Sequence, residues 1–526
     1  MWAPLCATKA LRGTSLPGRD GDGPRARGPL VIGSGVGPLD SASVSGTNLP
    51  SKECIQRMLF NSFGFILLFL PLVLGVAGFL RGRLLLAWVA AVSFVFYSFA
   101  GHVWFLVPML FTTLLDFVVA QRMARATSKQ QRRLLLSVSL VGNLGLLAHF
   151  KYSGLITHSL QAICAALIGA NVAPQWIHVF DVLLPAGISF YTFQTLSYML
   201  DVYRGVCPPE RSLLKFAGFV SFFPHLVAGP LTRHDELIPQ LDRIARRGIQ
   251  PMWRAGIFLF AIGLCKKVLV ADRVAQIIDP MLDEGQRLGL LGGWIAMLGY
   301  SVQIYFDFSG YSDMAIGLGR LFGIELPQNF DSPYQATSPA EFWRRWHMTL
   351  SRWLRDYLYI SLGGNRCSRA RRHFNLIATM VLGGLWHGAS WTFAAWGLFH
   401  GLVLVVYHAI EPRWDRMSAT IRRGLTFVLV CFGWVFFRAR TFEQAGRWFG
   451  ALVGLEGVHG AGSLSRLSGG AAIIACALVV ANVVPNASTS SSLPAIGPWR
   501  QIALGLGTGL ALVFMSYSSK FLYFQF

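Results

Sequence analysis

Long, nearly uninterrupted runs of apolar residues constrain the fold of this chain more than any other feature. A helix needs roughly 20 apolar residues to cross a bilayer, and many stretches here approach or exceed that length. Lipid offers the backbone no hydrogen-bond partner, so such runs must be helical, and they lack the alternation that a membrane β-barrel needs. We therefore predict an all-α, multi-pass integral membrane protein. The predicted spans are 59–80, 84–100, 103–120, 134–150, 182–200, 255–271, 291–306, 424–438, 470–484 and 501–517, and 374–409 is long enough for one tilted helix or two short ones.

The composition agrees with one large membrane body. Charged residues make up 13% of the 526 residues, against roughly 25% in a soluble domain. The net charge of +21 comes from residues between the apolar runs, as the positive-inside rule expects. We interpret it as a sign of membrane orientation and predict no nucleic-acid partner. The eight cysteines form no Cys-x-x-Cys pair and the histidines show no ligand spacing, so no metal site is predicted.

The N-terminal segment differs from the rest of the chain. Residues 1–57 are rich in Gly, Pro, Ser and Arg, a composition that predicts disorder. Met58 stands directly before the first apolar run. We therefore expect a membrane domain over 58–526, with 1–57 either a mis-annotated upstream extension or a genuine disordered tail.

Basic loops predict which segments face the cytoplasm. Four segments combine many Lys or Arg residues with positions between apolar runs, and the positive-inside rule places them in the cytoplasm. They are Gln121–Arg133, 231–254, 341–373 and 411–423. In 341–373, Trp and Leu also recur at helical spacing beside arginines, a pattern typical of amphipathic helices that lie at the membrane interface.

Two apolar segments contain residues that favour a break. The stretch 213–230 is short, ends in Pro and Gly, and has basic flanks, so we predict a re-entrant segment, which is tolerated only where protein or water covers it. An ordinary kinked span is the alternative. Because both flanks of 374–409 are predicted to be cytoplasmic, this segment must cross an even number of times. Gly383, Gly384 and Gly388 supply a plausible break.

Two histidines are the main candidates for chemistry. His387 lies inside 374–409, beside the predicted break and next to Trp386, a candidate tunnel residue. A titratable ring at membrane depth is costly and usually functional, and histidine suits proton transfer near neutral pH. We predict that His387 acts as a base that takes the proton of a hydroxyl during acyl transfer. His347, in the basic aromatic segment, is predicted to assist it. A structural hydrogen bond is the alternative for either ring.

Three further residues are secondary candidates. Asp307 and Asp313 flank a predicted break of small residues in an apolar run, and buried acids need partners. We expect them either to orient a histidine or to pair with an arginine such as Arg344 or Arg345. His225, in the predicted re-entrant segment, is a candidate cavity-lining residue.

Several continuous motifs resemble the membrane-bound O-acyltransferase family, and within it the branch of alginate O-acetyltransferase membrane subunits. The resemblance covers about 58–526. The motifs that carry it are QIYFDFSGYSDMA at 303–315, PQNF at 327–330, FWRRWHMTLSRWLRDYLYI at 342–360, LGGNR at 362–366 and GLWHGA at 384–389.

The resemblance implies a fold of about eleven transmembrane helices, with a tunnel between the two sides of the membrane. His387 matches the catalytic histidine of the family, whereas His347 falls where other branches carry different residues. The resemblance further implies an enzyme of the bacterial inner membrane that takes acetyl groups from a cytoplasmic donor, acetyl-CoA or another acyl thioester. No bound cofactor is implied. A periplasmic partner resembling SGNH hydrolases then acetylates the polysaccharide acceptor, alginate in this branch.

The C-terminal sequence KFLYFQF at 520–526 resembles an aromatic motif of this branch. On that basis Tyr523 is a candidate transient acyl carrier, because a phenol becomes a fair nucleophile when a base takes its proton. An aromatic anchor at the membrane interface is the alternative.

Competing functions stay open at this point. The same chemistry on cellulose or peptidoglycan, or transfer of D-alanine to teichoic acid, would use the same residues. A transporter without acyl transfer is a different class, and it would not need His387 as a base.

Overall fold

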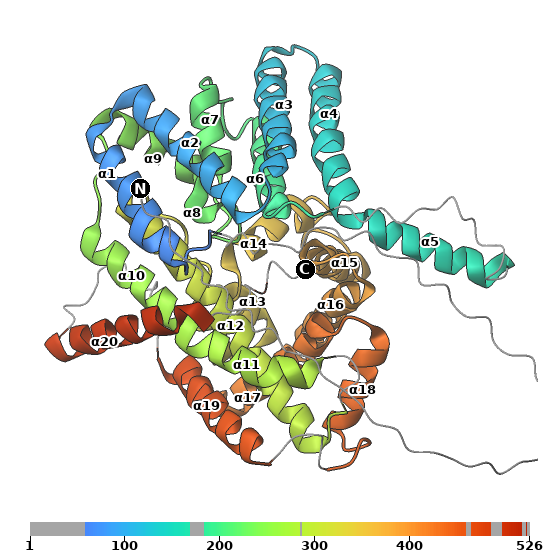
Figure 1. The fold of residues 1–526 in the computed structure, drawn as a ribbon. Coiled ribbons are helices and arrows are strands. Elements are labelled where there is room, and N and C mark those ends of the chain that lie inside the picture. Colours follow the sequence, from blue (N-terminus) through green and yellow to red (C-terminus); the bar gives the residue numbers. More distant parts are fainter. Residues whose placement is uncertain are drawn as a thin grey trace, which may run out of the picture. The chain divides into compact units, whose positions relative to one another are not determined.

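The computed structural model describes residues 58–168, 183–283, 287–458, 464–484, 486, 497–517 and 522. All regular secondary structure in these ranges is helical (Figure 1). The 1–57 segment and Tyr523 lie outside the described residues.

The first part of the chain forms apolar helices that leave large side chains uncovered. Their bounds are η1 Gly64–Phe69, α1 Leu70–Phe79, α2 Gly82–Ala100, η2 Val103–Phe105, α3 Leu106–Arg125, α4 Lys129–Leu147, η3 Ala148–Tyr152 and α5 Ser153–Ile168. On α3, Phe111 and Leu114 are about half exposed, and on α4 Val141 is 72% exposed. Such apolar faces are costly in water and suit lipid.

The next part of the chain forms helices that are interrupted by short non-helical stretches. It comprises α6 Ile188–Arg204, α7 Leu213–Ser221, α8 Phe223–Leu226 and α9 His234–Arg247. The predicted break in 213–230 is present, because α7 ends at Ser221 and α8 is a single turn with Pro224 near its start. Both α7 and α8 are largely buried. This setting fits backbone that departs from a continuous helix.

Helix α12, Leu290–Leu321, forms the centre of the described fold. It is buried along nearly its whole length and packs against α10 Trp253–Cys265, η5 Lys266–Ala271 and α11 Asp272–Leu282 (Figure 1). The predicted break between Asp307 and Asp313 is wrong, since α12 runs through both residues without interruption. Ion pairs with lysines satisfy the two carboxylates inside the helix bundle.

The basic segment 341–373 belongs partly to the core. It folds as α13 Pro339–Arg345, α14 Met348–Trp353 and η7 Leu354–Tyr359, preceded by η6 Pro333–Gln335. Trp346 and Leu350 are each 2% exposed. The middle of this segment therefore packs against neighbouring helices, and its predicted position at the membrane interface stays a prediction.

Ion pairs join two segments that were predicted to share the cytoplasmic side. Arg233 pairs with Asp356 at 2.5 Å and Arg352 pairs with Glu236 at 2.7 Å. Burial alone would raise the pKa of Asp356, but hydrogen bonds and positive charge from Arg355 and Arg233 lower the pKa overall. The charged carboxylate is therefore the stable form at this junction, which agrees with a common side for the two loops.

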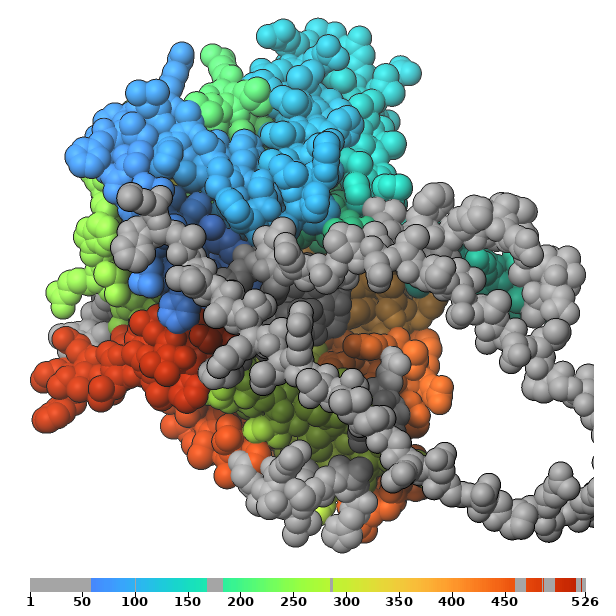
Figure 2. Space-filling view, in the orientation of Figure 1, coloured from blue at the N-terminus to red at the C-terminus, as the bar shows by residue number. Residues whose placement is uncertain are grey.

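The remaining helices complete the bundle. They are α15 Arg369–His387, α16 Trp391–Trp414, α17 Ala419–Arg438, α18 Phe442–Leu452, α19 Leu464–Val483, α20 Pro498–Phe514 and η9 Met515–Tyr517. Figure 2 shows α20, in red, at the surface of the face drawn, and its Trp499 and Leu506 are at least 72% exposed. By length and composition, five helical stretches in the described part of the chain can cross a membrane: Gly82–Phe99, Val103–Arg125, Lys129–Leu167, Trp391–Trp414 and Ala419–Arg438.

Candidate active site

His387 is the last residue of α15. Gly388 follows as the C-cap in an extended conformation, and α16 begins at Trp391 with Ser390 accepting a hydrogen bond from the backbone N–H of Thr392. The apolar stretch 374–409 is therefore two helices, as the predicted break implies, and the number of times that it crosses the membrane stays a prediction. The break lies at 388–390, whereas Gly383 and Gly384 lie inside α15.

Glycines let α15 and α16 approach each other closely near His387. A Cβ atom on Gly384 would lie 2.2 Å from the carbonyl oxygen of Phe393, and one on Gly397 would lie 2.2 Å from that of Met380. Real Cβ atoms do not come so close to backbone, so only glycine permits this packing. The position of His387 therefore depends on a glycine three residues earlier.

We expect Gly384→Ala to push the two helices apart and to lower both thermal stability and acyl transfer. Overpacking of this kind costs about 1–3 kcal/mol. Gly424→Ala in α17 is the matched control, because its added Cβ would meet nothing within 4 Å. Thermal unfolding of the two purified variants checks the prediction, and equal melting temperatures would contradict it.

His347 is buried and held in a defined orientation. It is the N-cap of α14, is 0% exposed and has a φ of +44°. Its Nδ1 lies 3.1 Å from Oδ1 of Asn329, and that oxygen also accepts from the backbone N–H and the hydroxyl of Thr349. Because a backbone N–H can only donate, the shared atom must be an oxygen, and Nδ1 of His347 must carry the proton. In the neutral ring its Nε2 therefore bears a lone pair, and no described residue forms a hydrogen bond with it.

The fold brings the two histidines together. Their ring centroids are 6.3 Å apart, although the residues are 40 positions apart in the chain. The ring of His387 packs against Trp386, Trp396 and Phe437 at 4.9–5.2 Å. This aromatic surrounding limits the access of water to the pair.

Residues at the end of α15 line two different cavities. The first, of about 180 Å³, is lined by His387 and mostly apolar residues, with Arg355 and Tyr359 from the basic segment. The second, of about 430 Å³, is lined by Gly388, Ser390, Lys151 and Arg438 among others. Consecutive residues, His387 and Gly388, thus line different cavities.

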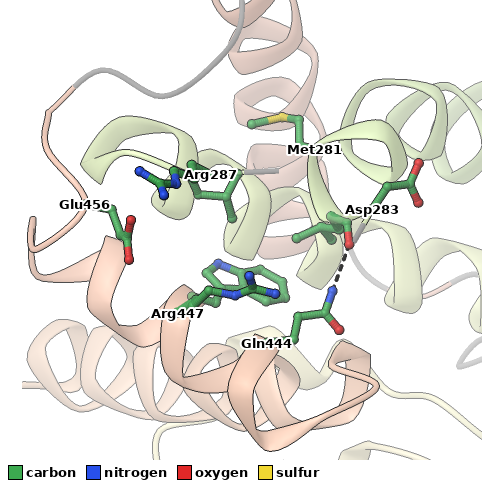
Figure 3. A pocket seen from close by; sticks show the side chains of 9 residues that line it. Met281, Asp283, Arg287, Gln444, Arg447 and Glu456 are labelled. Carbon is green, nitrogen blue, oxygen red and sulfur yellow. Dashed lines mark hydrogen bonds between the residues drawn. The ribbon is translucent and has the colours of Figure 1, made fainter. Parts of the chain in front are cut away.

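A third cavity lies elsewhere and is smaller. Its volume of about 30 Å³ suffices for one or two waters. Figure 3 shows the side chains around it, where Nε2 of Gln444 donates to the carbonyl oxygen of Leu282 at 2.9 Å. Neither histidine lines this cavity, so it does not belong to the candidate active site.

Asp307 and Asp313 pair with lysines and not with the predicted arginines. Lys267 bridges Asp307 at 2.6 Å and Asp272 at 2.8 Å, and Lys266 pairs with Asp313 at 2.6 Å. The lysines lie in η5, which packs directly against α12. The arginine prediction is therefore wrong, because it placed the basic partner in the wrong segment.

His225 and Trp386 each form a hydrogen bond in the structure, and their role at a tunnel stays a prediction. Nε2 of His225 contacts Oε1 of Gln194 at 3.2 Å, within a network that also includes Thr232. Trp386 donates its indole N–H to the carbonyl oxygen of Ser189 at 3.3 Å and lies edge-on to His387. In the described ranges, no group of three or more His, Cys, Asp or Glu side chains could hold a metal.

Leu522 contacts the Asp307 network. Leu522 is 2% exposed, and its backbone N–H donates to Oδ2 of Asp307 at 2.9 Å. Asp307 precedes Phe308, whose ring lies 4.8 Å from that of His347. The residue before Tyr523 is thus bound to a helix that contributes to the surroundings of His347.

Sequence reasoning missed Asn329 and Lys151. Asn329 stands in the PQNF motif, but its role needs the fold that carries it to His347. Lys151 donates to the carbonyl oxygens at the end of α15. It is the only Asp, Glu, Lys or Arg between 134 and 180, and a lone charge in an apolar run is a signal that could have found it.

Comparison with known proteins agrees with this geometry. The model of MBOAT, the membrane-bound O-acyltransferase family, matches residues 209–443, which include both histidines. The probable alginate O-acetylase AlgI of Azotobacter vinelandii is 43% identical over 75% of this chain and 78% of its own length. The peptidoglycan O-acetyltransferase of Helicobacter pylori is 37% identical over 78% and 82%. The teichoic acid D-alanyltransferase of Bacillus subtilis is 27% identical over 49% and 69%. By this similarity, over a region that contains the paired histidines, the chain belongs to the membrane-bound O-acyltransferase family.

Proposed function

We propose that this enzyme moves acetyl groups from a cytoplasmic thioester across the bacterial inner membrane for O-acetylation of an exopolysaccharide, with alginate as the glycan. The observation that carries the proposal is the position of His387, which is paired with His347 and lines one cavity while the next residue, Gly388, lines another. A base at this point can serve a donor from one cavity and an acceptor from the other. The similarity to AlgI proteins supports alginate over the other glycans.

We propose acetyl-CoA as the donor, entering through the cavity that His387 lines. Arg355 and Tyr359 at this cavity come from the segment 341–373, whose eight arginines suit a donor that carries phosphates. The apolar lining excludes water that would otherwise compete as the acceptor. The thioester itself carries the activated acetyl group, so the proposed reaction needs no resident cofactor.

In the proposed reaction, His387 takes the proton of an acceptor hydroxyl while the hydroxyl oxygen attacks the thioester carbonyl. A C–O bond forms and the C–S bond breaks, and the departing thiolate takes up the proton. His347 assists, because the lone pair on its Nε2 can accept a hydrogen bond beside the reacting groups. The products are an acetyl ester and the free thiol of CoA.

We also propose a domain range, a number of transmembrane helices and a partner protein that go beyond the described helices. The chain comprises one acyltransferase domain over 58–526 with about eleven transmembrane helices. A periplasmic acetyltransferase resembling SGNH hydrolases receives the acetyl group and acetylates the polysaccharide. Because a peptidoglycan O-acetyltransferase is among the relatives, another glycan is the alternative acceptor.

Mass analysis of cell-surface glycans tests this function. Cells that carry wild-type protein are compared with cells that carry His387→Gln, and the alginate and peptidoglycan fractions are analysed separately. We expect acetyl esters to disappear from alginate alone in the variant. Loss from peptidoglycan alone would reassign the acceptor, and unchanged acetylation of both glycans would reject acyl transfer by His387.

We propose that Tyr523 carries the acetyl group between donor and partner. Its phenol oxygen attacks the donor carbonyl to form a phenyl ester, and a hydroxyl of the partner then takes the acetyl group and releases the phenol. The hydrogen bond from the backbone N–H of the preceding Leu522 to Asp307 supports this role, because it holds the neighbour of Tyr523 at the helix that carries Phe308, which contacts His347.

Tyr523→Phe is expected to abolish polysaccharide acetylation, because it removes the nucleophile and keeps the aromatic ring. Phe524→Leu is the control that keeps the phenol. Mass spectrometry of the C-terminal peptide should detect one added acetyl group in the wild type and none in Tyr523→Phe. Unchanged glycan acetylation in Tyr523→Phe would reject the carrier role.

A further inference from the structure

Lys151 is a charged residue whose role the proposed chemistry leaves unexplained. It lies in η3, inside the candidate membrane span Lys129–Leu167. Its ammonium donates to Oγ of Ser189 at 3.1 Å, to the carbonyl oxygen of His387 at 3.1 Å and to that of Trp386. An ammonium has three N–H donors, so these acceptors use all of them. A ligand could bind the ammonium only by displacing one.

The acceptors show what the lysine does. The last carbonyl groups of a helix have no partner within that helix, and a cation at this end is stabilised by the helix dipole. The hydroxyl of Tyr152 donates to the carbonyl oxygen of Leu385 at 2.8 Å. Lys151 and Tyr152 thus hold three consecutive carbonyls, those of Leu385, Trp386 and His387, and so fix the end of α15.

The same lysine lines one cavity and binds the backbone of a residue that lines the other. Lys151 and Gly388 line the cavity of about 430 Å³, whereas His387 lines the one of about 180 Å³. The hydrogen bond from Lys151 to the carbonyl oxygen of His387 therefore connects a residue in the wall of the larger cavity with the backbone of a residue in the wall of the smaller one. Loss of this hydrogen bond would let the backbone of His387 move, and its ring would shift relative to both cavities.

We propose that Lys151 is a positioning residue that holds His387 between donor and acceptor. This inference rests on the proposed function of His387. Small displacements of a catalytic group can cost about a hundredfold in rate. Lysine provides length, charge and three donors at once, which a neutral side chain of similar length lacks.

The test uses Lys151→Met, which keeps the approximate length and removes the charge and the donors, and Lys151→Arg, which keeps both. Tyr152→Phe is the matched control, since it removes one uncharged hydrogen bond from the neighbouring carbonyl. Two quantities are measured on the full chain. They are the acetyl content of the glycan in cells and the rate at which diethyl pyrocarbonate modifies individual histidines, followed by peptide mass spectrometry.

We expect Lys151→Met to lower acetylation at least tenfold and to raise the modification rate of His387 severalfold, with His225 unchanged. His225 is an internal reference, because it is buried in the separate Gln194 network. Lys151→Arg should restore part of the acetylation, and Tyr152→Phe should have a smaller effect than Lys151→Met.

Three results would overturn the inference. The first is that Lys151→Met has the acetylation and the His387 modification rate of the wild type. The second is an equal rise in the modification rates of His225 and His387, which would indicate general destabilisation. The third is a failure of Lys151→Arg to restore any acetylation. If His387→Gln keeps full acetylation, the proposed function fails instead, and the modification rates still decide whether Lys151 positions His387.

Discussion

Replacement of His387 by glutamine is expected to reduce acyl transfer by roughly 10²–10⁴-fold, the range that a general base contributes. Glutamine retains a polar group near the position of the ring but cannot accept a proton at neutral pH. The measurement is the rate at which purified protein in lipid nanodiscs transfers labelled acetyl from acetyl-CoA, the proposed donor, in the presence of the proposed periplasmic partner.

The control for this variant is His400→Gln on α16. His400 is also buried, at 2% exposed, and its ring lies 5.1 Å from that of Trp396, which His387 contacts as well. A histidine that serves only packing can lose its basic nitrogen without loss of chemistry. We therefore expect His400→Gln to keep at least half of the activity. Equal losses in the two variants would indicate that disturbed aromatic packing, and not lost basicity, inactivates the enzyme.

Replacement of His347 by asparagine is expected to reduce acyl transfer by about 10²-fold or more, with little change in thermal stability. The backbone at this position has a φ of +44°, a conformation that asparagine tolerates better than most residues. An alanine at the same place would add backbone strain to the loss of the ring. Asparagine therefore removes the basic nitrogen and leaves the turn before α14 intact.

Asn329 provides an independent check on the role of His347. Asn329→Leu removes the acceptor that fixes the protonated Nδ1 of His347, whereas Asn329→Asp keeps an acceptor oxygen. We expect activity to fall in the order wild type, Asn329→Asp, Asn329→Leu. If Asn329→Leu is folded and fully active, the tautomer of His347 does not matter to the reaction. Wild-type activity of His347→Asn would remove His347 from the chemistry altogether.

The local sequence predicted His387 better than its surroundings. A histidine beside glycines within an apolar run indicates a helix end at membrane depth, and the structure places His387 at the last residue of α15. The prediction that 374–409 contains a break followed from the charges on its two flanks. Both inferences depend on residues that are close in the chain, so they needed no knowledge of the fold.

Inferences about partners in space were less successful. Asp307 and Asp313 were expected to break a helix and to pair with arginines of the basic segment. In the structure α12 is continuous, and the partners are Lys267 and Lys266. A buried acid requires a partner, but its sequence position does not say which neighbouring helix supplies it. The same reason explains why Asn329 was missed, and why the acceptors of Lys151 could not be predicted.

By itself the sequence determined that this chain is a helical membrane protein of the acyltransferase type, because apolar length, loop charge and continuous motifs are local properties. Only the tertiary structure decided which groups meet. It brought His347 within 6.3 Å of His387, fixed its tautomer through Asn329 and joined the end of α15 to Lys151. The physical reason is that hydrogen bonds and ring contacts act over a few ångströms, and only the packing of the helices determines which distant residues come that close.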